Sequence, residues 1–271
     1  MVISNRCYEE WKEGNSKLLK GFSQKDILML YSGGKDSSFA MELVLRAGEE
    51  FGFGFKVIAG AFPRHRYPDS EKDKLGTYWR ERGTDIIWLD LPETDEAIRS
   101  AENPCTMCRG IRKKFLKGIV AEVERIEELV IVVNYNLWDL VGYSLERILG
   151  DILTGSRRAG GGDISRRFWE TAQRFHPFVK MKEGYSVFRP VLQYNGNYID
   201  SQLEAMKIPV LSIPCAYRNN RPKKVFEAYY NKMGLSFNYA DVFNFAEKAL
   251  DLPPLSRYLS IDKEEYLGKI F

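Results

Sequence analysis

The sequence predicts an α/β fold in which a parallel sheet is flanked by helices. Short runs rich in Val, Ile and Leu alternate with segments whose apolar residues recur at helical spacing. This alternation is typical of a parallel sheet with crossover helices. The apolar run 27–31 ends abruptly at the glycine turn Ser32-Gly33-Gly34, and a helical pattern follows. Such a turn lies at the carboxyl end of a strand, where open α/β sheets bind ligands.

The strands are predicted from apolar runs of strand length. The first run ends at Tyr31, and the β-branched run Leu129 to Val133 is the fourth. A short extended segment is expected around Arg189-Pro190. The predicted strands are 27–31, 55–62, 85–91 and 129–133, with the extended segment at 188–191.

The helices are predicted from apolar faces and start signals. Phe39 and Val44 belong to the apolar face of the helix after the glycine turn, and Pro104 opens the helix that follows the third strand. Further along, 155–165 is rich in glycine and arginine and is expected to be a loop. The predicted helices are 5–22, 35–50, 69–82, 104–124, 140–153, 199–206, 225–232 and 242–250.

Composition sets broad limits on the class of protein. The 271 residues suit one large domain with an appendage, and we expect a helical segment 1–24, an α/β domain 25–219 and a helical appendage 220–271. No apolar stretch reaches membrane-spanning length, and Met1 to Glu13 is too polar for a signal peptide. Four cysteines, with Cys7 interpreted as structural, argue against a secreted disulfide framework. We therefore expect a cytoplasmic protein without a membrane partner.

The distribution of charge is more informative than the net charge of +3. Basic residues form three clusters beside the motifs discussed below, which favours a phosphate-rich partner, although a charge run is usually a solvated face. The clusters are Arg109, Arg112, Lys113, Lys114 and Lys117; Arg157, Arg158, Arg166, Arg167 and Arg174; and Arg218, Arg221, Lys223 and Lys224.

The glycine turn is predicted to bind phosphate. Its backbone N–H groups and the dipole of the following helix favour an anion, and Gly33 and Gly34 leave no side chain in the way. Ser32 and Ser37 add hydroxyl donors, and Lys35 adds a positive charge. Asp36 would repel phosphate unless a cation lies between them, so it predicts Mg²⁺.

Three cysteines are candidates for thiolate chemistry. Cys105 and Cys108 form a Cys-x-x-Cys at a predicted helix start, where the helix dipole favours thiolates. Cys215 lies far along the chain in Ile213-Pro214-Cys215. Three thiolates can hold a [4Fe-4S] cluster with one iron open, whereas a structural zinc site takes a fourth ligand. The pair also fits a redox dithiol, and Cys215 fits a small buried hydrophobe.

The order of these motifs resembles the PP-loop ATP pyrophosphatases, whose signature is Ser-Gly-Gly-x-Asp-Ser. Asn136, Leu137 and Asp139 match the Gly-His-Asn-Leu-Asp-Asp segment of the tRNA-thiolating members. Arg189-Pro190 is similar to their Arg-Pro-Leu, and Cys215 lies where their third cysteine is expected. The best match is the tRNA 2-thiocytidine synthetase group, over residues 25–218.

This resemblance implies an adenine nucleotide alpha hydrolase-like fold and ATP-dependent thiolation of a base carbonyl carbon, with tRNA as the partner. Cys105, Cys108 and Cys215 would hold a [4Fe-4S] cluster and would be catalytic together with Lys35 and Asp36. Asp36 would also bind Mg²⁺, and sulfur would come from a cysteine desulfurase or free sulfide. A homodimer is implied as well. The expected ATP contacts are Ser32, Gly33, Gly34, Lys35, Asp36, Ser37, Ala61, Phe62, Asn134 and Asp139.

Other functions remain open from the residues. One keeps thiolation without a cluster: Cys215 carries a persulfide, and Cys105 or Cys108 acts as the second thiol. Another changes the substrate to a free nucleobase or another small molecule. A third is amidation with ammonia or an amine, against which the three cysteines argue. A non-enzymatic nucleotide-binding module is disfavoured by the intact Lys35 and Asp36.

The arginines of the glycine-rich loop are the best candidates for RNA contacts, since basic side chains bind phosphates. These residues are Arg157, Arg158, Arg166 and Arg167. We predict that the double substitution Arg157→Ala and Arg158→Ala weakens binding of tRNA in a filter assay and leaves the affinity for ATP intact. Unchanged affinity for RNA would remove this assignment.

Overall fold

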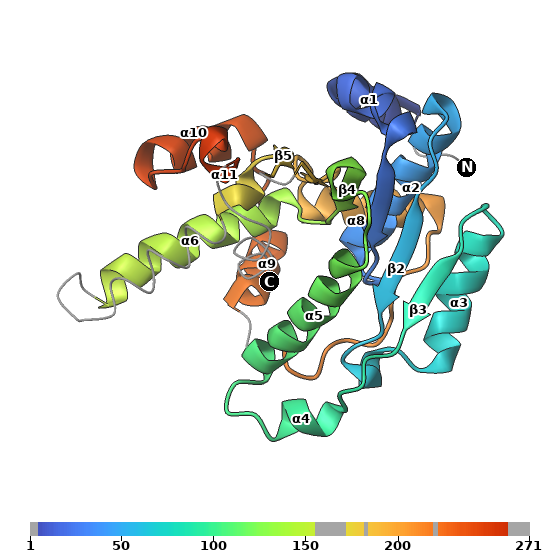
Figure 1. The fold of residues 1–271 in the computed structure, drawn as a ribbon. Helices are drawn as coiled ribbons and strands as arrows, with labels where there is room; N and C mark the ends of the chain where they lie inside the picture. The colour runs from blue at the N-terminus through green and yellow to red at the C-terminus, as the bar shows by residue number, and fades with distance from the viewer. Residues whose placement is uncertain (1–4, 155–171, 182–183, 219–221, 260–271) are drawn as a thin grey trace.

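The structure, a computed structural model, describes residues 5–154, 172–181, 184–218 and 222–259. Within them a sheet has six strands in the order β3-β2-β1-β4-β6-β5 (Figure 1). All neighbours pair in parallel except β5, which runs antiparallel to β6 at one edge. The predicted α/β fold with a mostly parallel sheet is confirmed. The strands are β1 Asp26–Leu30, β2 Lys56–Gly60, β3 Ile86–Leu89, β4 Leu129–Val132, β5 Phe178–Lys180 and β6 Ser186–Phe188.

Helices cover both faces of the sheet (Figure 1). One face packs against α1 Asn5–Lys20, α2 Lys35–Phe51, α3 Asp69–Arg80 and α8 Gly196–Met206. The other packs against α5 Pro104–Ala121 and α11 Leu255–Tyr258. The remaining helices are α4 Asp95–Arg99, α6 Leu137–Thr154, α9 Pro222–Lys232 and α10 Tyr239–Ala249. Among the described residues, none of these helices has the length and apolar composition needed to cross a bilayer.

The central position of β1 in the sheet explains why its residues 27–30 are all apolar. Met29 faces the core that Trp11, Phe39 and Trp79 complete, whereas Leu28 faces the core on the side of α5. A strand buried on both faces carries a continuous apolar run rather than an alternating one. Burial of this run stabilises the fold by roughly 25 cal/mol per Å² of apolar surface removed from water.

Two departures from the predicted elements have local causes. Helix α6 begins at Leu137 rather than at residue 140, because Asn136 and Asp139 cap it reciprocally. Asn136 accepts a bond from the Asp139 backbone N–H at 3.1 Å, and the Asp139 carboxylate accepts one from the Asn136 N–H at 3.0 Å. Strand β5 and helix α4 were not predicted, since three and five residues are too short to display a period.

Residues 209–218, which we name the crossing segment, run from the glycine turn to the third cysteine. The Leu211 N–H donates to Gly33 O at 2.7 Å, which ties the segment to the turn after β1. Glu71 of α3 accepts from the Ser212 N–H at 2.9 Å and from the Ser212 hydroxyl. Lys74 donates to Glu71 and to Val210 O. The crossing segment is thus fixed by polar contacts along its first half.

We predict that Glu71→Gln destabilises the protein in a pH-dependent manner. Burial opposes ionisation, but the bonds from Lys74 and Ser212 prevail and lower the pKa of the Glu71 carboxyl from 4.5 to about 2. Because the pKa is lower in the folded state, the ionised carboxyl stabilises the fold above pH 4.5, and this contribution is lost as the pH falls towards 2.

The free energy of unfolding of the variant should be about 1–3 kcal/mol lower at pH 7. Urea denaturation between pH 2 and 7 measures the difference, which should shrink towards the acid end. Glu81→Gln, at an exposed position after the same helix, is the matched control and should change stability little. A constant difference across this pH range would contradict the role given to the Glu71 charge.

Candidate active site

The turn between β1 and α2 is built by its own serines and glycines. Gly33 has a φ of 68°, a left-handed conformation that favours glycine, and Gly34 is the N-cap of α2. The Ser32 and Ser37 hydroxyls lie 3.2 Å apart. The Gly34 N–H donates to the Ser32 hydroxyl at 3.4 Å, and the Ser37 hydroxyl donates to Gly34 O at 2.8 Å. These bonds hold the turn in one shape.

The turn is also braced from outside. Tyr67 donates its hydroxyl to Ser32 O at 3.0 Å, and the Leu211 N–H donates to Gly33 O. A Cβ at Gly33 would lie 3.1 Å from a methyl carbon of Leu75 and 3.2 Å from Cβ of Leu211. The leading N–H groups of α2 have no carbonyl partner within the helix. With the helix dipole, such N–H groups give the turn a geometry that suits an anion, so phosphate binding at the turn stays a prediction.

Lys35 and Asp36, the first residues of α2, contact different elements. Lys35 Nζ lies 2.6 Å from a carboxylate oxygen of Asp200 and 3.1 Å from Gly196 O, both on α8. It also lies over the indole ring of Trp138, 5.3 Å from the ring centroid. Asp36 accepts a hydrogen bond from the Asn136 side-chain amide at 2.8 Å. The segments that follow β1 and β4 therefore meet at the carboxyl ends of these two strands.

The predicted ATP contacts beyond the turn have distinct environments. Asn134 donates its side-chain amide to Leu30 O at 2.9 Å and links the ends of β4 and β1. Asp139 is buried at the start of α6. Ala61 and Phe62 follow β2 and are also buried, and Phe62 packs with Leu91 in a small core cluster. The structure therefore brings Asn136 directly against Asp36 and places Asp139 beside Asn136.

Lys223 is a site residue whose place the sequence did not reveal. It lies in the first turn of α9, and its ammonium group contacts the Asp139 carboxylate and lies 3.9 Å from Glu227. Burial lowers the pKa of Lys223 to about 8, although Glu227 and Asp36 oppose this effect. Burial also raises the pKa of Asp36, against the charges of Lys223 and Lys35. In the sequence, Lys223 could be recognised only as a member of the basic cluster around residues 218–224.

A cavity of about 470 Å³ lies beside Lys35 and α9. It carries both signs of charge, and the indole of Trp138 forms part of its wall. Helix α9 packs against α6 (Figure 1) and contributes part of the lining of this cavity. The charged side chains that line it are Lys35, Asp200, Arg218, Lys224 and Glu227.

The structure brings the segment that carries Cys215 to the start of α5. Asn103 caps this helix through the Thr106 N–H at 3.0 Å, and Cys105 and Cys108 lie in its first two turns. The Cys105 thiol donates to Tyr217 O at 3.8 Å. All three cysteines are partly exposed thiols. Cys105 is therefore in contact with a residue two positions after Cys215.

His65 and Asp95 support this corner and were not assigned from the sequence. His65 Nδ1 lies 2.8 Å from the Asp95 carboxylate, which also accepts the backbone N–H groups of Arg64 and His65 at 2.7 Å. On its other side, His65 Nε2 accepts the Ala216 N–H at 3.3 Å. The backbone position directly after Cys215 is thus held by the imidazole.

The donor set in this corner suits an iron–sulfur cluster, because cysteine thiolates are the ligands of such clusters. Cys105 and Cys108 share one helix start. Contact with Tyr217 brings the third cysteine's segment to them. Among the described residues, no three His, Cys, Asp or Glu side chains are gathered as metal ligands. The three cysteines therefore fit an iron–sulfur cluster in the chemistry of their side chains and in belonging to segments that contact one another.

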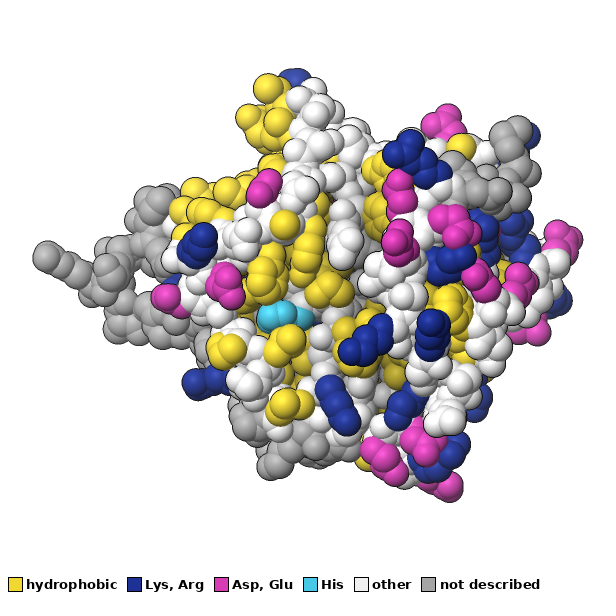
Figure 2. Space-filling view, turned by 90° about the horizontal axis from the view of Figure 1, so that it is seen from above, with side chains coloured by type: hydrophobic (Ala, Val, Ile, Leu, Met, Phe, Trp, Pro, Cys, Tyr) yellow, Lys and Arg dark blue, Asp and Glu magenta, His cyan; other side chains and the backbone are white. Residues whose placement is uncertain are grey.

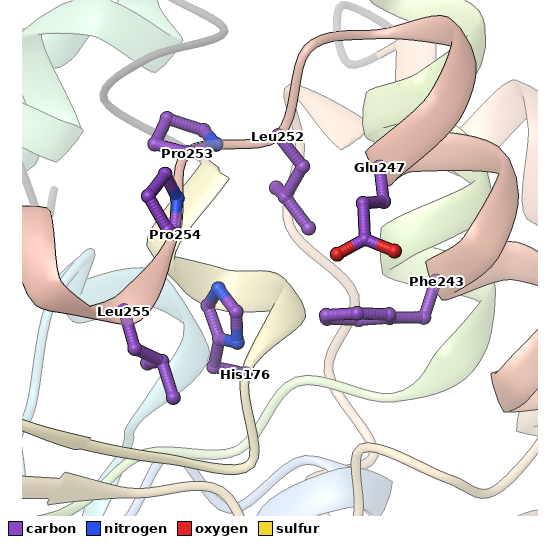
Figure 3. Close-up of a pocket in the computed structure, with 7 residues that line it drawn as sticks. All are labelled: His176, Phe243, Glu247, Leu252, Pro253, Pro254 and Leu255. Atoms are coloured by element: carbon purple, nitrogen blue, oxygen red, sulfur yellow. The ribbon is translucent and has the colours of Figure 1, made fainter.

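A second hollow, of about 490 Å³, lies between His176 and α10 (Figure 3). Figure 2 shows hydrophobic side chains gathered around a histidine on the molecule's upper face. Burial and the charge of Arg189 lower the pKa of His176 to about 4, so its imidazole is neutral at pH 7. Phe243, Leu252 and Glu247 complete much of the lining. No residue of the glycine turn or of the cysteine corner lines this hollow.

The arginines predicted to bind RNA, at positions 157, 158, 166 and 167, lie outside the described residues. The same holds for the glycine-rich loop that contains them. Their assignment therefore stays a prediction from the sequence.

The described residues thus form a mostly parallel α/β sheet with a glycine turn after β1. No model of a known protein family and no curated protein sequence matches this chain. Among solved structures, the U34-tRNA thiolase NcsA from Methanococcus maripaludis with its [4Fe-4S] cluster matches with a TM-score of 0.60 and 14% identity, covering 91% of this chain and 81% of the thiolase.

The NMN synthetase from Francisella tularensis matches with a TM-score of 0.44 and 9% identity, covering 96% of this chain and 95% of the synthetase. The likeness to the thiolase establishes the fold: this chain shares the α/β fold of that thiolase.

We predict that Gly33→Ala damages the turn whereas Gly34→Ala leaves the fold intact. Alanine at Gly33 meets both a positive φ and the close contacts with Leu75 and Leu211. At Gly34 the φ is −80°, and the nearest atom to a Cβ is the Ser32 hydroxyl at 3.4 Å. Chemical denaturation should show a loss of about 1–3 kcal/mol for Gly33→Ala only. Equal stability of the two variants would contradict this description of the turn.

Proposed function

We propose that this protein is an ATP-dependent sulfurtransferase that thiolates a base carbonyl carbon, most readily in tRNA. The observation that carries the proposal is that one sheet edge holds both a phosphate-type turn with Lys35 and Asp36 and a corner with Cys105, Cys108 and the Cys215 segment. The fold of PP-loop enzymes supports the use of ATP. The likeness to a tRNA thiolase supports, without establishing, the choice of substrate.

The first half of the reaction activates a poor leaving group. The carbonyl oxygen of the base attacks the α-phosphorus of ATP, and the bond from that phosphorus to the bridging oxygen breaks, so pyrophosphate departs. The N–H groups of α2 and Lys35 would stabilise the charge that develops on pyrophosphate. Asp36 would hold Mg²⁺ beside the phosphates, and Asn136 orients its carboxylate.

The second half replaces oxygen by sulfur. A sulfur nucleophile attacks the activated carbon, the carbon–oxygen bond breaks, and AMP leaves with the bonding electrons. Cys105, Cys108 and Cys215 would hold a [4Fe-4S] cluster, which when bound supplies an open iron site for sulfide. Asn103 caps the helix that carries Cys105 and Cys108, and His65 holds the backbone next to Cys215. The sulfur source would be free sulfide or a cysteine desulfurase.

The contact between Cys105 and Tyr217 favours one alternative without a cluster. A cysteine desulfurase would transfer the outer sulfur of its own persulfide to the Cys215 thiolate and recover its cysteine thiolate. The terminal sulfur of the resulting Cys215 persulfide would attack the activated carbon and displace AMP. The Cys105 thiolate would then attack Cys215 Sγ, which forms a Cys105–Cys215 disulfide and releases the thiolated base. A dithiol reductant would restore the two thiols for the next turnover.

We expect the protein purified without oxygen to contain about four iron and four sulfide per chain and to absorb broadly in the visible range. Cys108→Ala should lose this absorbance, and Cys7→Ala, a buried cysteine away from the corner, should keep it. Iron-free protein that still thiolates tRNA would favour the persulfide route.

The activity itself is measured by incubation with tRNA, MgATP and sulfide. AMP and pyrophosphate should form, and mass spectrometry of the digested tRNA should show a nucleoside 16 mass units heavier, since sulfur replaces oxygen. Asp36→Asn should abolish AMP formation without unfolding the chain. ATP cleavage that depends on ammonia, or on a free base rather than tRNA, would redirect the proposal to amidation or to a small-molecule substrate.

A further inference from the structure

The acidic residues of the nucleotide site share a single continuous network with α9. Asp36 accepts from Asn136, Asn136 and Asp139 bond reciprocally, and the Asp139 carboxylate contacts Lys223. Glu227 lies one turn further along α9 and contacts both Lys223 and Lys224. A helix that follows the third cysteine thus reaches the carboxylates beside the phosphate-type turn.

Charge balance explains why Lys223 lies there. Asp139 is buried and Asp36 is half-buried, so cationic groups close to these two carboxylates stabilise them. Lys35 is already engaged by Asp200 and the carbonyl of Gly196. Lys223 therefore supplies the cation that contacts Asp139 in this structure.

Binding of a magnesium nucleotide would change this balance. Mg²⁺ beside Asp36 would bring two positive charges, and the phosphates would bring several negative ones. A lysine ammonium on a flexible stem is well suited to exchange a carboxylate for a phosphate oxygen. Lys223 contacts Asp139 and belongs to the first turn of α9. It lies next to the cavity lined by Lys35 and Lys224.

We infer that Lys223 is a phosphate-binding residue of the nucleotide site, with Asp139 as its resting partner, and that it moves to the pyrophosphate portion of ATP when the magnesium complex binds. This inference rests on the proposed use of ATP. It gives α9 a role in recognising the polyphosphate, so the helical appendage completes the nucleotide site rather than standing apart from it.

A purely structural ion pair predicts something different. If Lys223 only stabilised Asp139, its loss would lower stability and weaken all nucleotides alike. If Lys223 binds the pyrophosphate portion, its loss would weaken ligands that contain pyrophosphate and spare AMP. A Lys223→Arg variant, which keeps the charge, would then retain affinity.

The test is isothermal titration calorimetry on the full chain with MgATP, magnesium pyrophosphate and AMP. We expect Lys223→Met to weaken MgATP and magnesium pyrophosphate roughly 10- to 100-fold and to change AMP less than about twofold. Lys223→Arg should stay within about tenfold of the wild type. Lys232→Met, which removes a charge from the exposed end of the same helix, should bind all three ligands like the wild type.

Hydrogen exchange on the wild-type chain supplies a measurement that needs no variant. Magnesium pyrophosphate should protect the amides of α9, and AMP should not. Equal affinities of wild type and Lys223→Met, an equal loss for AMP, or α9 exchange unaffected by pyrophosphate would overturn the inference. A wild-type chain that binds MgATP but thiolates nothing would defeat the proposed function alone, and one that binds no nucleotide would defeat both.

Discussion

The hydrogen bond from Leu211 to Gly33 is the constraint on which the rest of the site depends. Gly33 has the positive φ that the turn after β1 requires, and its carbonyl is fixed by a backbone N–H that comes from residues nearly 180 positions later. The same crossing segment continues to Cys215 and then to α9. This backbone contact therefore fixes the crossing segment, which carries the third cysteine, against the turn. Glu71 secures the contact from the side of α3.

Each of the three aspartates around the turn contacts a lysine or an amide group. Asp200 pairs with Lys35, and Asp139 pairs with Lys223. Asp36 accepts a hydrogen bond from the side-chain amide of Asn136. Low local dielectric makes such contacts strong and also makes an unpaired charge costly. The site is consequently sensitive to an arriving cation or anion, because each new charge must displace an existing partner. This sensitivity suits a site that binds and releases a magnesium polyphosphate in every turnover.

Much of the fold could be predicted from the sequence, because the apolar run of β1 and the helical pattern after Gly34 are strong local signals. The element β5 was missed because it is short, and α6 was predicted to begin too late because Asn136, assigned only to a family motif, is its cap. Lys223 could be seen as a basic residue but not placed, since its position depends on how α9 packs along α6. Tertiary contacts of this kind, including the one between His65 and Ala216, leave no periodic trace in the sequence.

The topology also explains why anionic chemistry gathers at one edge. In a parallel sheet each crossover helix begins where the preceding strand ends, so the positive ends of several helix dipoles point to the same side. Helix α2 presents its first turn to the phosphate-type site, α5 presents its first turns with Cys105 and Cys108, and α6 is capped by the Asp139 carboxylate. These three helix starts, which favour anions, lie on the same side of the sheet because the strands before them run in the same direction. Under the proposed function, the phosphates of ATP and the cysteine sulfurs would both lie on this side of the sheet.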